Sequence, residues 1–382
     1  MKRHLFVTFG RQALGEAVAA RRIAEDLARE GDQIVCLAPR EHAPALAGAG
    51  FKVGIITPVA ARCLDAVVRD TLRAERCDSL CLADLTAMAL TCDVSGIPVP
   101  AFLPAGVSVV GIDLWEVRDA DRRYDVHGRA ARIDAAILDV PAMRPVPVVR
   151  PTAPGAYDAL PPPAPPAERA AVRAEMGLSA DGPIVLLPTS AWQNVPPAHA
   201  AVAAVPALLT EYVAAAGVTL AHVGPAPLPG GGPGYMWIPP LASAQYRRLL
   251  AACDALLTLN LTQMSVGAAI ADGVPVIGVV STLSPDAARP GPLLRAWASG
   301  VPPLPPFYAW PIGFREFLRP ALDGNPLLDA IATCELLDED ALVGTLRRVV
   351  RDPGEALARQ ARYAAMVRAL PRPAAAYRRL SG

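Results

Sequence analysis

The stretch that decides the fold is Leu5-Phe6-Val7-Thr8-Phe9, which leads into Gly10-Arg11-Gln12-Ala13-Leu14-Gly15-Glu16. A short apolar run followed by a glycine-containing loop and a segment of helical period is typical of the first strand, turn and helix of a doubly wound α/β domain. A second run, Ile184-Val185-Leu186-Leu187, continues into Pro188-Thr189-Ser190 in the same way. We therefore predict two tandem Rossmann-like, doubly wound domains facing across a cleft, since parallel sheets bind ligands at the carboxyl ends of their strands.

Strands and helices are expected to alternate through both halves of the chain. In the first half, apolar runs predict strands at 33–38, 52–56, 79–82 and 99–103. In the second half they predict strands at 184–187, 219–223, 255–259 and 274–280, with late helices near 339–351 and 354–370. Helical crossovers of this length join parallel strands.

Proline marks the expected boundary between the domains. We expect an N-terminal domain over 1–160, a proline-rich linker at about 145–166, a second domain over 167–352 and closing helices over 353–382. A second proline-dense stretch, 285–311, predicts a loop or an insertion. The length of 382 residues agrees with two domains, because one hydrophobic core rarely extends so far.

Composition disfavours several classes of function. The formal net charge is zero, so nothing favours binding to nucleic acid or to an anionic membrane. Apolar runs are too short for an integral membrane segment or a signal peptide, so a cytoplasmic protein is expected, with its oligomeric state left open. The seven cysteines form no Cys-x-x-Cys pair and are expected to be buried apolar residues rather than zinc ligands.

The first loop does not carry the pattern of a resident cofactor site. Gly10 and Gly15 are spaced as Gly-x-x-x-x-Gly rather than as a dinucleotide fingerprint, and no Lys-Ser/Thr pair completes a Walker motif. No Asp-x-Asp or His-rich cluster suggests a metal. We therefore expect neither a cofactor nor a metal.

Glu16 is a carboxylate in the first turn of a predicted helix, directly after the glycine loop. Two interpretations stand at this point. The Glu16 carboxylate either stabilises the helix by interacting with the positive end of its dipole or acts as a general base at the carboxyl edge of the sheet. Arg11 in the same loop either neutralises a phosphate or is simply solvated. Asp84, which follows another strand, is expected to cap the next helix.

The loop from Asn260 to Gln263 lies between a predicted strand and a predicted helix. Amide N–H groups at a helix N-terminus attract anions, so the loop predicts a site for a diphosphate, with Ser265 adding a hydroxyl. Ordinary helix capping by Asn260, Thr262 and Ser265 is the alternative.

Three segments in the second half resemble a known family. Trp237-Ile238-Pro239-Pro240-Leu241 precedes Leu249-Leu250-Ala251-Ala252-Cys253-Asp254, and the following loop and helix end in Gly273-Val274-Pro275-Val276-Ile277. With Arg173-Ala174-Glu175-Met176-Gly177-Leu178 they resemble the donor domain of GT-B glycosyltransferases, which include the UDP-glycosyltransferases and the lipid II-forming enzyme. Leu14-Gly15-Glu16 is similar to the Ser-x-Gly-Glu of some Kdo transferases, in which the glutamate is the base.

The resemblance implies a metal-independent glycosyltransferase that takes a nucleotide-linked donor and a small-molecule acceptor. The first domain would bind the acceptor, the second would bind the donor, and residues 353–382 would cross back to the first. Glu16 would be the general base. Donor and phosphate contacts would come from the glycine loop and from strand ends: Gly10, Arg11, Gly15, Ser190, Trp192, Gln193, His222, Gly224, Ile238, Asn260, Thr262, Gln263 and Ser265.

The residues also leave alternatives open. His222 is either a residue lining the cleft or a hydrogen-bonded core histidine, and Trp192 is either a donor contact or a packing lid. Ala268 stands where these glycosyltransferases carry a glutamate for the donor ribose. A nucleotide-sugar 2-epimerase and a protein with a non-glycosyl or purely binding function on the same fold therefore remain as alternatives.

Overall fold

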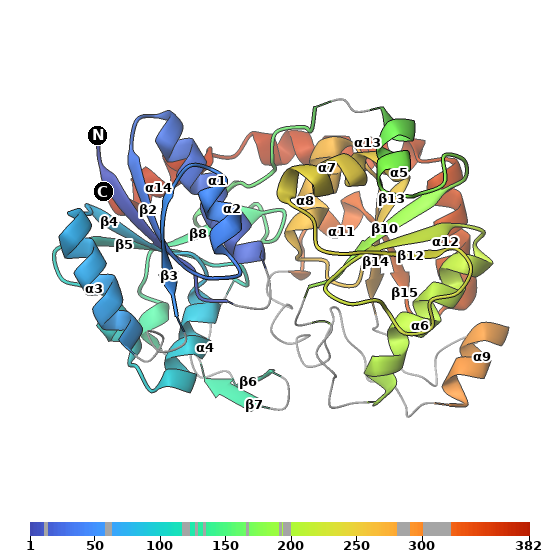
Figure 1. Ribbon diagram of the computed structural model, residues 1–382, viewed down its shortest axis with the longest axis horizontal. Coiled ribbons are helices and arrows are strands. Elements are labelled where there is room, and N and C mark those ends of the chain that lie inside the picture. The colour runs from blue at the N-terminus through green and yellow to red at the C-terminus, as the bar shows by residue number, and fades with distance from the viewer. Residues whose placement is uncertain are drawn as a thin grey trace. The chain divides into compact units, whose positions relative to one another are not determined.

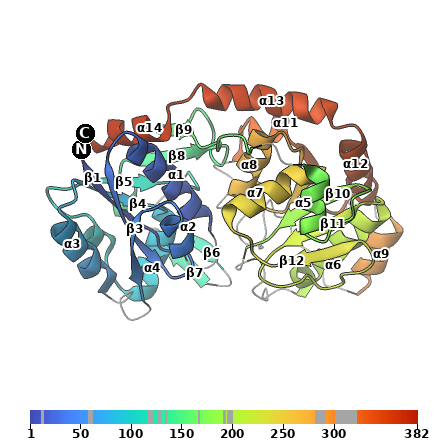
Figure 2. The same ribbon diagram turned by 45° about the horizontal axis from the view of Figure 1, so that its top comes forward.

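The computed structural model describes residues 1–10, 14–57, 63–116, 123–126, 129–132, 135–165, 168–190, 193, 200–280, 291–300 and 322–382 (Figures 1 and 2). The chain divides into two compact units. Unit 1 comprises Met1–Ala159, Arg319–Asn325 and Val367–Gly382. Unit 2 comprises Leu160–Leu318 and Pro326–Met366.

Unit 1 is built on a seven-stranded sheet in which every neighbouring pair of strands is parallel. Its spatial order is β3 (Lys52–Ile56), β2 (Gln33–Pro39), β1 (Arg3–Val7), β4 (Ser79–Leu82), β5 (Ser108–Ile112), β8 (Ala142–Val146) and β9 (Ala156–Asp158). The helices are α1 (Gly15–Arg29), α2 (Ala43–Ala47), α3 (Leu64–Glu75), α4 (Leu85–Ser95) and α14 (Pro373–Ser381), with short 3-10 turns η2 (Val99–Phe102) and η3 (Ala135–Ile137). Strands β6 (Arg123–Val126) and β7 (Arg129–Arg132) form a separate two-stranded antiparallel sheet.

Unit 2 is built on a six-stranded parallel sheet. Its order is β12 (Tyr235–Ile238), β11 (Thr219–Val223), β10 (Ile184–Pro188), β13 (Ala255–Thr258), β14 (Val276–Val280) and β15 (Ala332–Glu335). The helices are α5 (Arg169–Glu175), α6 (Ala200–Ala215), α7 (Ser243–Ala252), α8 (Met264–Asp272), α9 (Pro292–Ala298), α11 (Leu327–Ala330), α12 (Glu339–Arg351) and α13 (Gly354–Arg368). The prediction of two Rossmann-like α/β domains is confirmed.

The central strands are apolar on both faces because helices cover both sides of a parallel sheet. Leu5, Phe6 and Val7 of β1 have no exposed surface, and neither do Leu80 and Leu82 of β4. Strand β10 repeats the pattern in unit 2. This continuous burial is why the two runs that open the halves of the chain could be recognised as central strands.

One predicted strand is wrong. The predicted strand at 99–103 is instead the 3-10 turn η2 (Val99–Phe102) and the residue after it, and the strand that completes this part of the sheet is β5, at Ser108–Ile112. Pro98 and Pro100 explain the error, since proline has no amide hydrogen to donate to a neighbouring strand. An apolar run that contains proline was therefore mistaken for a central strand.

The proline-rich stretch predicted as a linker carries two strands of the sheet of unit 1. Strands β8 and β9 lie at Ala142–Val146 and Ala156–Asp158, so the chain leaves unit 1 only after Ala159. The second proline-dense stretch lies partly outside the described residues, and its described part holds α9.

All seven cysteines are free thiols. Six are buried, as expected, and burial raises the pKa of Cys36 and Cys253 to about 12. Cys63 is exposed, contrary to the prediction. Among the described helices, none has the length and apolar character needed to span a bilayer.

Helix α14 closes unit 1 by packing against α1 and against β5, β8 and β9. Its fully buried Tyr377 stacks on Phe6 at a ring distance of 5.9 Å and meets the edge of His4 at 5.4 Å. The Tyr377 hydroxyl lies 2.7 Å from Ser79 Oγ, which in turn lies 2.7 Å from His4 Nδ1. The last helix is thus attached to both central strands of the sheet.

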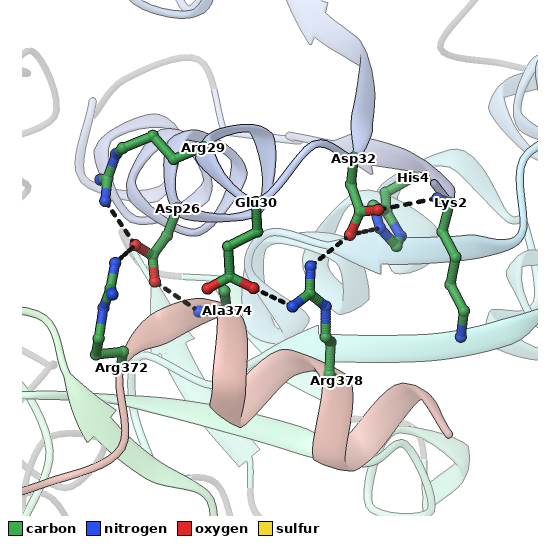
Figure 3. A network of polar contacts seen from close by, with 9 residues as sticks. All are labelled: Lys2, His4, Asp26, Arg29, Glu30, Asp32, Arg372, Ala374 and Arg378. Carbon is green, nitrogen blue, oxygen red and sulfur yellow. Dashed lines mark hydrogen bonds and ion pairs between the residues drawn. The ribbon is translucent and has the colours of Figure 1, made fainter.

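Ion pairs surround this aromatic contact (Figure 3). Asp26 of α1 accepts the Ala374 amide at 3.0 Å and pairs with Arg372, while Arg378 pairs with Glu30 and, at 2.8 Å, with Asp32. Burial alone would raise the pKa of Asp32, but Arg378 and the Lys2 amide hold it well below its usual range.

Tyr377→Ala is expected to destabilise unit 1 by about 3–5 kcal/mol, because it removes a fully buried aromatic ring from between α14 and the sheet. Arg379→Ala, an exposed change on the same helix, should stay within about 0.5 kcal/mol of wild type. Urea denaturation followed by circular dichroism measures both. Equal stabilities for the two variants would show that α14 is not part of the cooperative core.

Candidate functional site

Glu16 is buried at the carboxyl end of β1, with 4% of its surface exposed. Its Oε1 atom accepts the Phe9 amide at 2.5 Å and the Gly10 amide at 2.8 Å. The carboxylate therefore folds back from α1 onto the end of the strand that precedes it. The Phe9 and Gly10 amides are thus satisfied by a side chain of the same chain.

His42 completes this arrangement, and the sequence interpretation missed it. The residue lies just beyond β2, at the N-cap of α2, and is fully buried. Its Nδ1 atom lies 3.0 Å from Thr8 Oγ1 and 3.3 Å from Glu16 Oε1. A signal was present, because His42 follows the carboxyl end of the strand next to β1.

The second carboxylate oxygen, Oε2, is placed differently. Within the described part of the chain, no hydrogen bond or ion pair reaches Oε2. A Cβ atom at Gly10 would lie 3.3 Å from Oε2, so a side chain at this position would crowd the carboxylate. Gly15 begins α1, one residue before Glu16.

Asp84 places a second acidic group beside Glu16. Its Oδ1 accepts the amides of Thr86 and Ala87, both at 2.9 Å, so Asp84 caps α4 as the sequence suggests. Burial, with the negative charges of Glu16 and Asp113, raises the pKa of Asp84 to about 8. Burial and the neighbouring carboxylates therefore favour the protonated form of Asp84.

Two more carboxylates follow β5, and arginines hold both. Asp113 accepts a hydrogen bond from Arg144 Nε at 2.9 Å, and Glu116 forms a two-point ion pair with Arg150. Unit 1 thus carries acidic side chains after the adjacent strands β1, β4 and β5. Among the described residues, no group of histidine, cysteine and acidic side chains is arranged to hold a metal ion.

In unit 2, the loop between β13 and α8 is held by its own side chains. Asn260 Oδ1 accepts the amide of Thr262 at 3.1 Å and its hydroxyl at 2.8 Å. Gln263 Nε2 donates to Thr258 Oγ1 at 2.5 Å, and Gln263 is the N-cap of α8 without bonding the helix amides through its side chain. These residues are brought together, and the amide of Asn260 is bound by Thr258 at 3.0 Å.

The remaining residues predicted to bind the donor lie in α8, after β10 and in the first loop of the chain. Ser265 Oγ is buried beside the Tyr246 hydroxyl. After β10, the Ser190 amide donates to Gln193 Oε1 at 2.8 Å, which closes a short turn at the strand end. Arg11 and Trp192 lie outside the residues that the structure describes.

Of the two alternatives for His222, the structure shows the hydrogen-bonded core histidine. It has no exposed surface, and its ring nitrogens lie 2.8 Å from Thr189 Oγ1 and 2.9 Å from the Tyr235 hydroxyl. Burial lowers the pKa of His222 to about 4, so the ring is neutral near pH 7. Gly224 has no room for a side chain, since a Cβ there would lie 2.3 Å from Thr189 Oγ1.

Trp237 was not predicted as a site residue, yet it is the exposed aromatic side chain at this edge. It lies opposite His222 on the neighbouring strand β12, with 39% of its surface exposed. Its indole Nε1 donates to the Gly224 carbonyl at 2.9 Å, which fixes the ring while part of it stays exposed. Ile238, the next residue, is buried and pairs with Val223.

Comparison with known proteins places the chain in a family. The chain belongs to DUF6365, a family of unknown function, which it matches over residues 23–378. No curated protein matches it.

Solved structures share the fold at low sequence identity. SsfS6, a glycosyltransferase of Streptomyces sp. SF2575, is 13% identical with a TM-score of 0.53 over 100% of both chains, and it has also been solved with thymidine diphosphate. The spinosyn forosaminyltransferase SpnP is 13% identical (TM-score 0.56, 99% of this chain and 98% of that one). A putative UDP-N-acetylglucosamine 2-epimerase from Listeria monocytogenes is 14% identical (TM-score 0.55, 100% and 95%). The fold is that of GT-B glycosyltransferases.

Asp84→Asn is expected to change how stability depends on pH. The pKa of Asp84 is about 8 in the folded protein and near 3.8 in an unfolded chain, so folding takes up a proton between these values. Wild type therefore loses stability as pH rises through this window, by up to about 1.4 kcal/mol per pH unit. Asparagine keeps the capping oxygen and has no proton to lose.

The measurement is the free energy of unfolding by urea at several values between about pH 5 and pH 8. The advantage of Asp84→Asn over wild type should grow with pH across this range. Asp93→Asn, at an exposed position of the same helix, serves as the control and should run parallel to wild type. A constant offset for Asp84→Asn would mean that the carboxyl group is already ionised at pH 5.

Proposed function

We propose that this protein is a metal-independent glycosyltransferase that moves a sugar from a nucleotide-linked donor to a small-molecule acceptor, with Glu16 as general base. The observation that carries the proposal is the asymmetry of the Glu16 carboxylate. Oε1 is anchored by two amides and lies near His42, whereas Oε2 has no such contact among the described residues. A carboxylate held through one oxygen keeps the lone pairs of the other oxygen for a proton, which is what a general base needs.

In the proposed reaction, Oε2 accepts the proton of an acceptor hydroxyl or amine. The acceptor atom forms its bond to the anomeric carbon as the bond from that carbon to the diphosphate oxygen breaks, and the electron pair leaves with the diphosphate. Asp84 supports this role because burial and nearby negative charge raise its pKa, which favours its neutral form and lessens its repulsion of Glu16.

We assign the donor to unit 2, where the described residues that directly follow β11 and β13 are uncharged. The exposed face of Trp237, held by its bond to Gly224, offers a surface on which a nucleobase can stack. The start of α8, which Gln263 precedes, supplies amide N–H groups and the positive end of a helix dipole for the diphosphate. SsfS6, which shares the fold, has been solved with thymidine diphosphate.

Glu16→Gln is expected to lower turnover at least tenfold, which corresponds to about 1.4 kcal/mol of barrier, while leaving nucleotide binding unchanged. The assay incubates the protein with UDP- and dTDP-linked sugars and a panel of alcohol and amine acceptors, and detects glycosylated product by mass spectrometry. Glu25→Gln, on the same helix and paired with Arg21, is the matched control.

Two outcomes would count against this proposal. If Glu16→Gln keeps more than about a tenth of wild-type turnover, Glu16 is not the base. If the protein converts the donor sugar in the absence of any acceptor, the 2-epimerase is the correct function instead. Binding of nucleotides with no conversion under any condition would favour a protein that only binds its ligand.

Trp237→Ala is expected to weaken the binding of thymidine diphosphate and UDP. Stacking of a base on an aromatic ring contributes about 1–3 kcal/mol, so the dissociation constant should rise about 5- to 150-fold. Isothermal titration calorimetry measures the change. The control is Trp297→Ala on α9, whose indole donates to the Ala204 carbonyl at 3.0 Å. Equal affinities for wild type and Trp237→Ala would remove Trp237 from the donor site.

A further inference from the structure

Two buried polar groups of unit 1 have no hydrogen-bond partner within the described part of the chain. One is the hydroxyl of Tyr157 on β9, a side chain with no exposed surface. The other is Nε of Arg22 on α1. Folded proteins satisfy nearly all of their buried polar groups, and a buried charge without a partner is costly. Both groups therefore need an explanation.

The two groups belong to one packed region of unit 1, because α14 packs against both α1 and β9. Burial lowers the pKa of Arg22, and the nearby carboxylate of Asp158, the residue after Tyr157, opposes this effect. Burial raises the pKa of the Tyr157 hydroxyl, and the positive charge of Arg22 is close enough to oppose that change. The unpartnered hydroxyl and the unpartnered guanidinium thus lie within electrostatic range of each other.

The carboxylates near Arg22 are engaged by other groups. Asp158 pairs with Arg368 at 2.8 Å. Asp26 follows Arg22 by four residues on the same side of α1, but its two oxygens are bound by Arg372 and, at 3.0 Å, by a backbone amide (Figure 3). Among the residues that the structure describes, no hydrogen bond or ion pair joins Arg22 to either carboxylate.

The charges described in this region do not balance. Four guanidinium groups lie beside two carboxylates, namely Arg22, Arg29, Arg368 and Arg372 beside Asp26 and Asp158. A guanidinium has only hydrogen-bond donors, and a phenol hydroxyl can donate as well. The ligand that complements these groups therefore accepts hydrogen bonds and carries negative charge. A guanidinium can also donate two parallel hydrogen bonds to the oxygens of one phosphate group.

We propose that Arg22 and Tyr157 bind a small oxyanion of the phosphate or sulfate class in the region where α14 packs against α1 and β9. The anion would neutralise part of the excess positive charge and connect α1 with the last strand of the sheet. Arg22 lies six residues after Glu16, about 9 Å further along α1, so this site is separate from the proposed base. The inference does not depend on the proposed glycosyl transfer.

The first test measures phosphate binding by isothermal titration calorimetry. The protein is first exchanged into buffer free of phosphate and sulfate. We expect wild type to bind inorganic phosphate, sulfate to compete for the same site, and thymidine diphosphate to leave this binding unchanged. Loss of phosphate binding in the presence of thymidine diphosphate would assign the anion to the donor site and overturn the proposal.

The second test locates the anion with matched variants. Tyr157→Phe removes only the hydroxyl and should raise the dissociation constant for phosphate about 10-fold, because a hydrogen bond to a charged group is lost. Arg22→Met removes the guanidinium and should abolish measurable binding. Arg379→Met removes a positive charge from an exposed position of α14 and should bind phosphate as wild type does.

A third measurement compares stability in phosphate and in chloride. The free energy of unfolding by urea is determined in sodium phosphate and in sodium chloride at equal ionic strength. Phosphate should stabilise wild type more than chloride does, since a ligand that binds only the folded state favours it, and Arg22→Met should lose this difference. If Arg22→Met does not fold, Tyr157→Phe decides alone.

Three results would contradict the site. Folded wild type that binds neither phosphate nor sulfate has no such site. Equal phosphate affinities in wild type and Tyr157→Phe would exclude the hydroxyl and with it the proposed pair. Equal weakening in Arg22→Met and Arg379→Met would indicate general attraction of anions to positive charge rather than a specific site.

Discussion

The structure of unit 1 depends on one buried carboxylate. Glu16 Oε1 accepts the amides of Phe9 and Gly10, which follow β1, and lies 3.3 Å from His42 Nδ1. A charged group is costly to bury unless it is hydrogen-bonded, and each bond to a charged group contributes about 1.5–3 kcal/mol. These contacts offset the desolvation of Glu16. They also fix the direction of its other oxygen, on which the proposed chemistry relies.

The side chains at the carboxyl ends of the two sheets differ in charge. This difference supports the proposal that unit 1 binds the acceptor and unit 2 binds the donor. In unit 1, carboxyl groups follow three adjacent strands, and Glu16 is held by amides and a histidine. In unit 2, the groups near the ends of β11 and β13 are Thr258, Asn260, Gln263 and a neutral His222, while the acidic Glu335 ends the edge strand β15. Near Glu16 an anionic diphosphate would meet a buried carboxylate, whereas the residues that directly follow β11 and β13 carry no charge. The charge pattern therefore supports a donor on unit 2 and a neutral or basic acceptor group near Glu16.

The sequence predicted much of the fold but less of the site. Hydrophobic periodicity located β1, β2, β4 and β10, because strands covered on both faces must be apolar throughout. It failed at residues 99–103, where proline forbids a central strand, and in the proline-rich stretch that holds β8 and β9. The prolines of this stretch lie among residues that form the last two strands of the sheet of unit 1, so its proline-rich composition wrongly indicated a linker.

The site shows the same limit. Glu16 could be predicted because it directly follows the glycine loop in the sequence. His42 lies 26 residues after Glu16 in the sequence. The two side chains are close only because β1 pairs with β2. Trp237 was read as part of a family resemblance, and its exposed, hydrogen-bonded ring became visible only in the fold.

The sequence by itself determined the two α/β domains, the central strands and the position of an acidic residue at the first turn. Such features follow from local patterns of apolar and polar residues, which the chain carries whether it is folded or not. Tertiary structure alone decided which oxygen of Glu16 is anchored, which histidine lies beside it and that the pKa of the Asp84 carboxyl group is raised. Burial and contacts between distant segments set these properties, and both arise only when neighbouring strands pair.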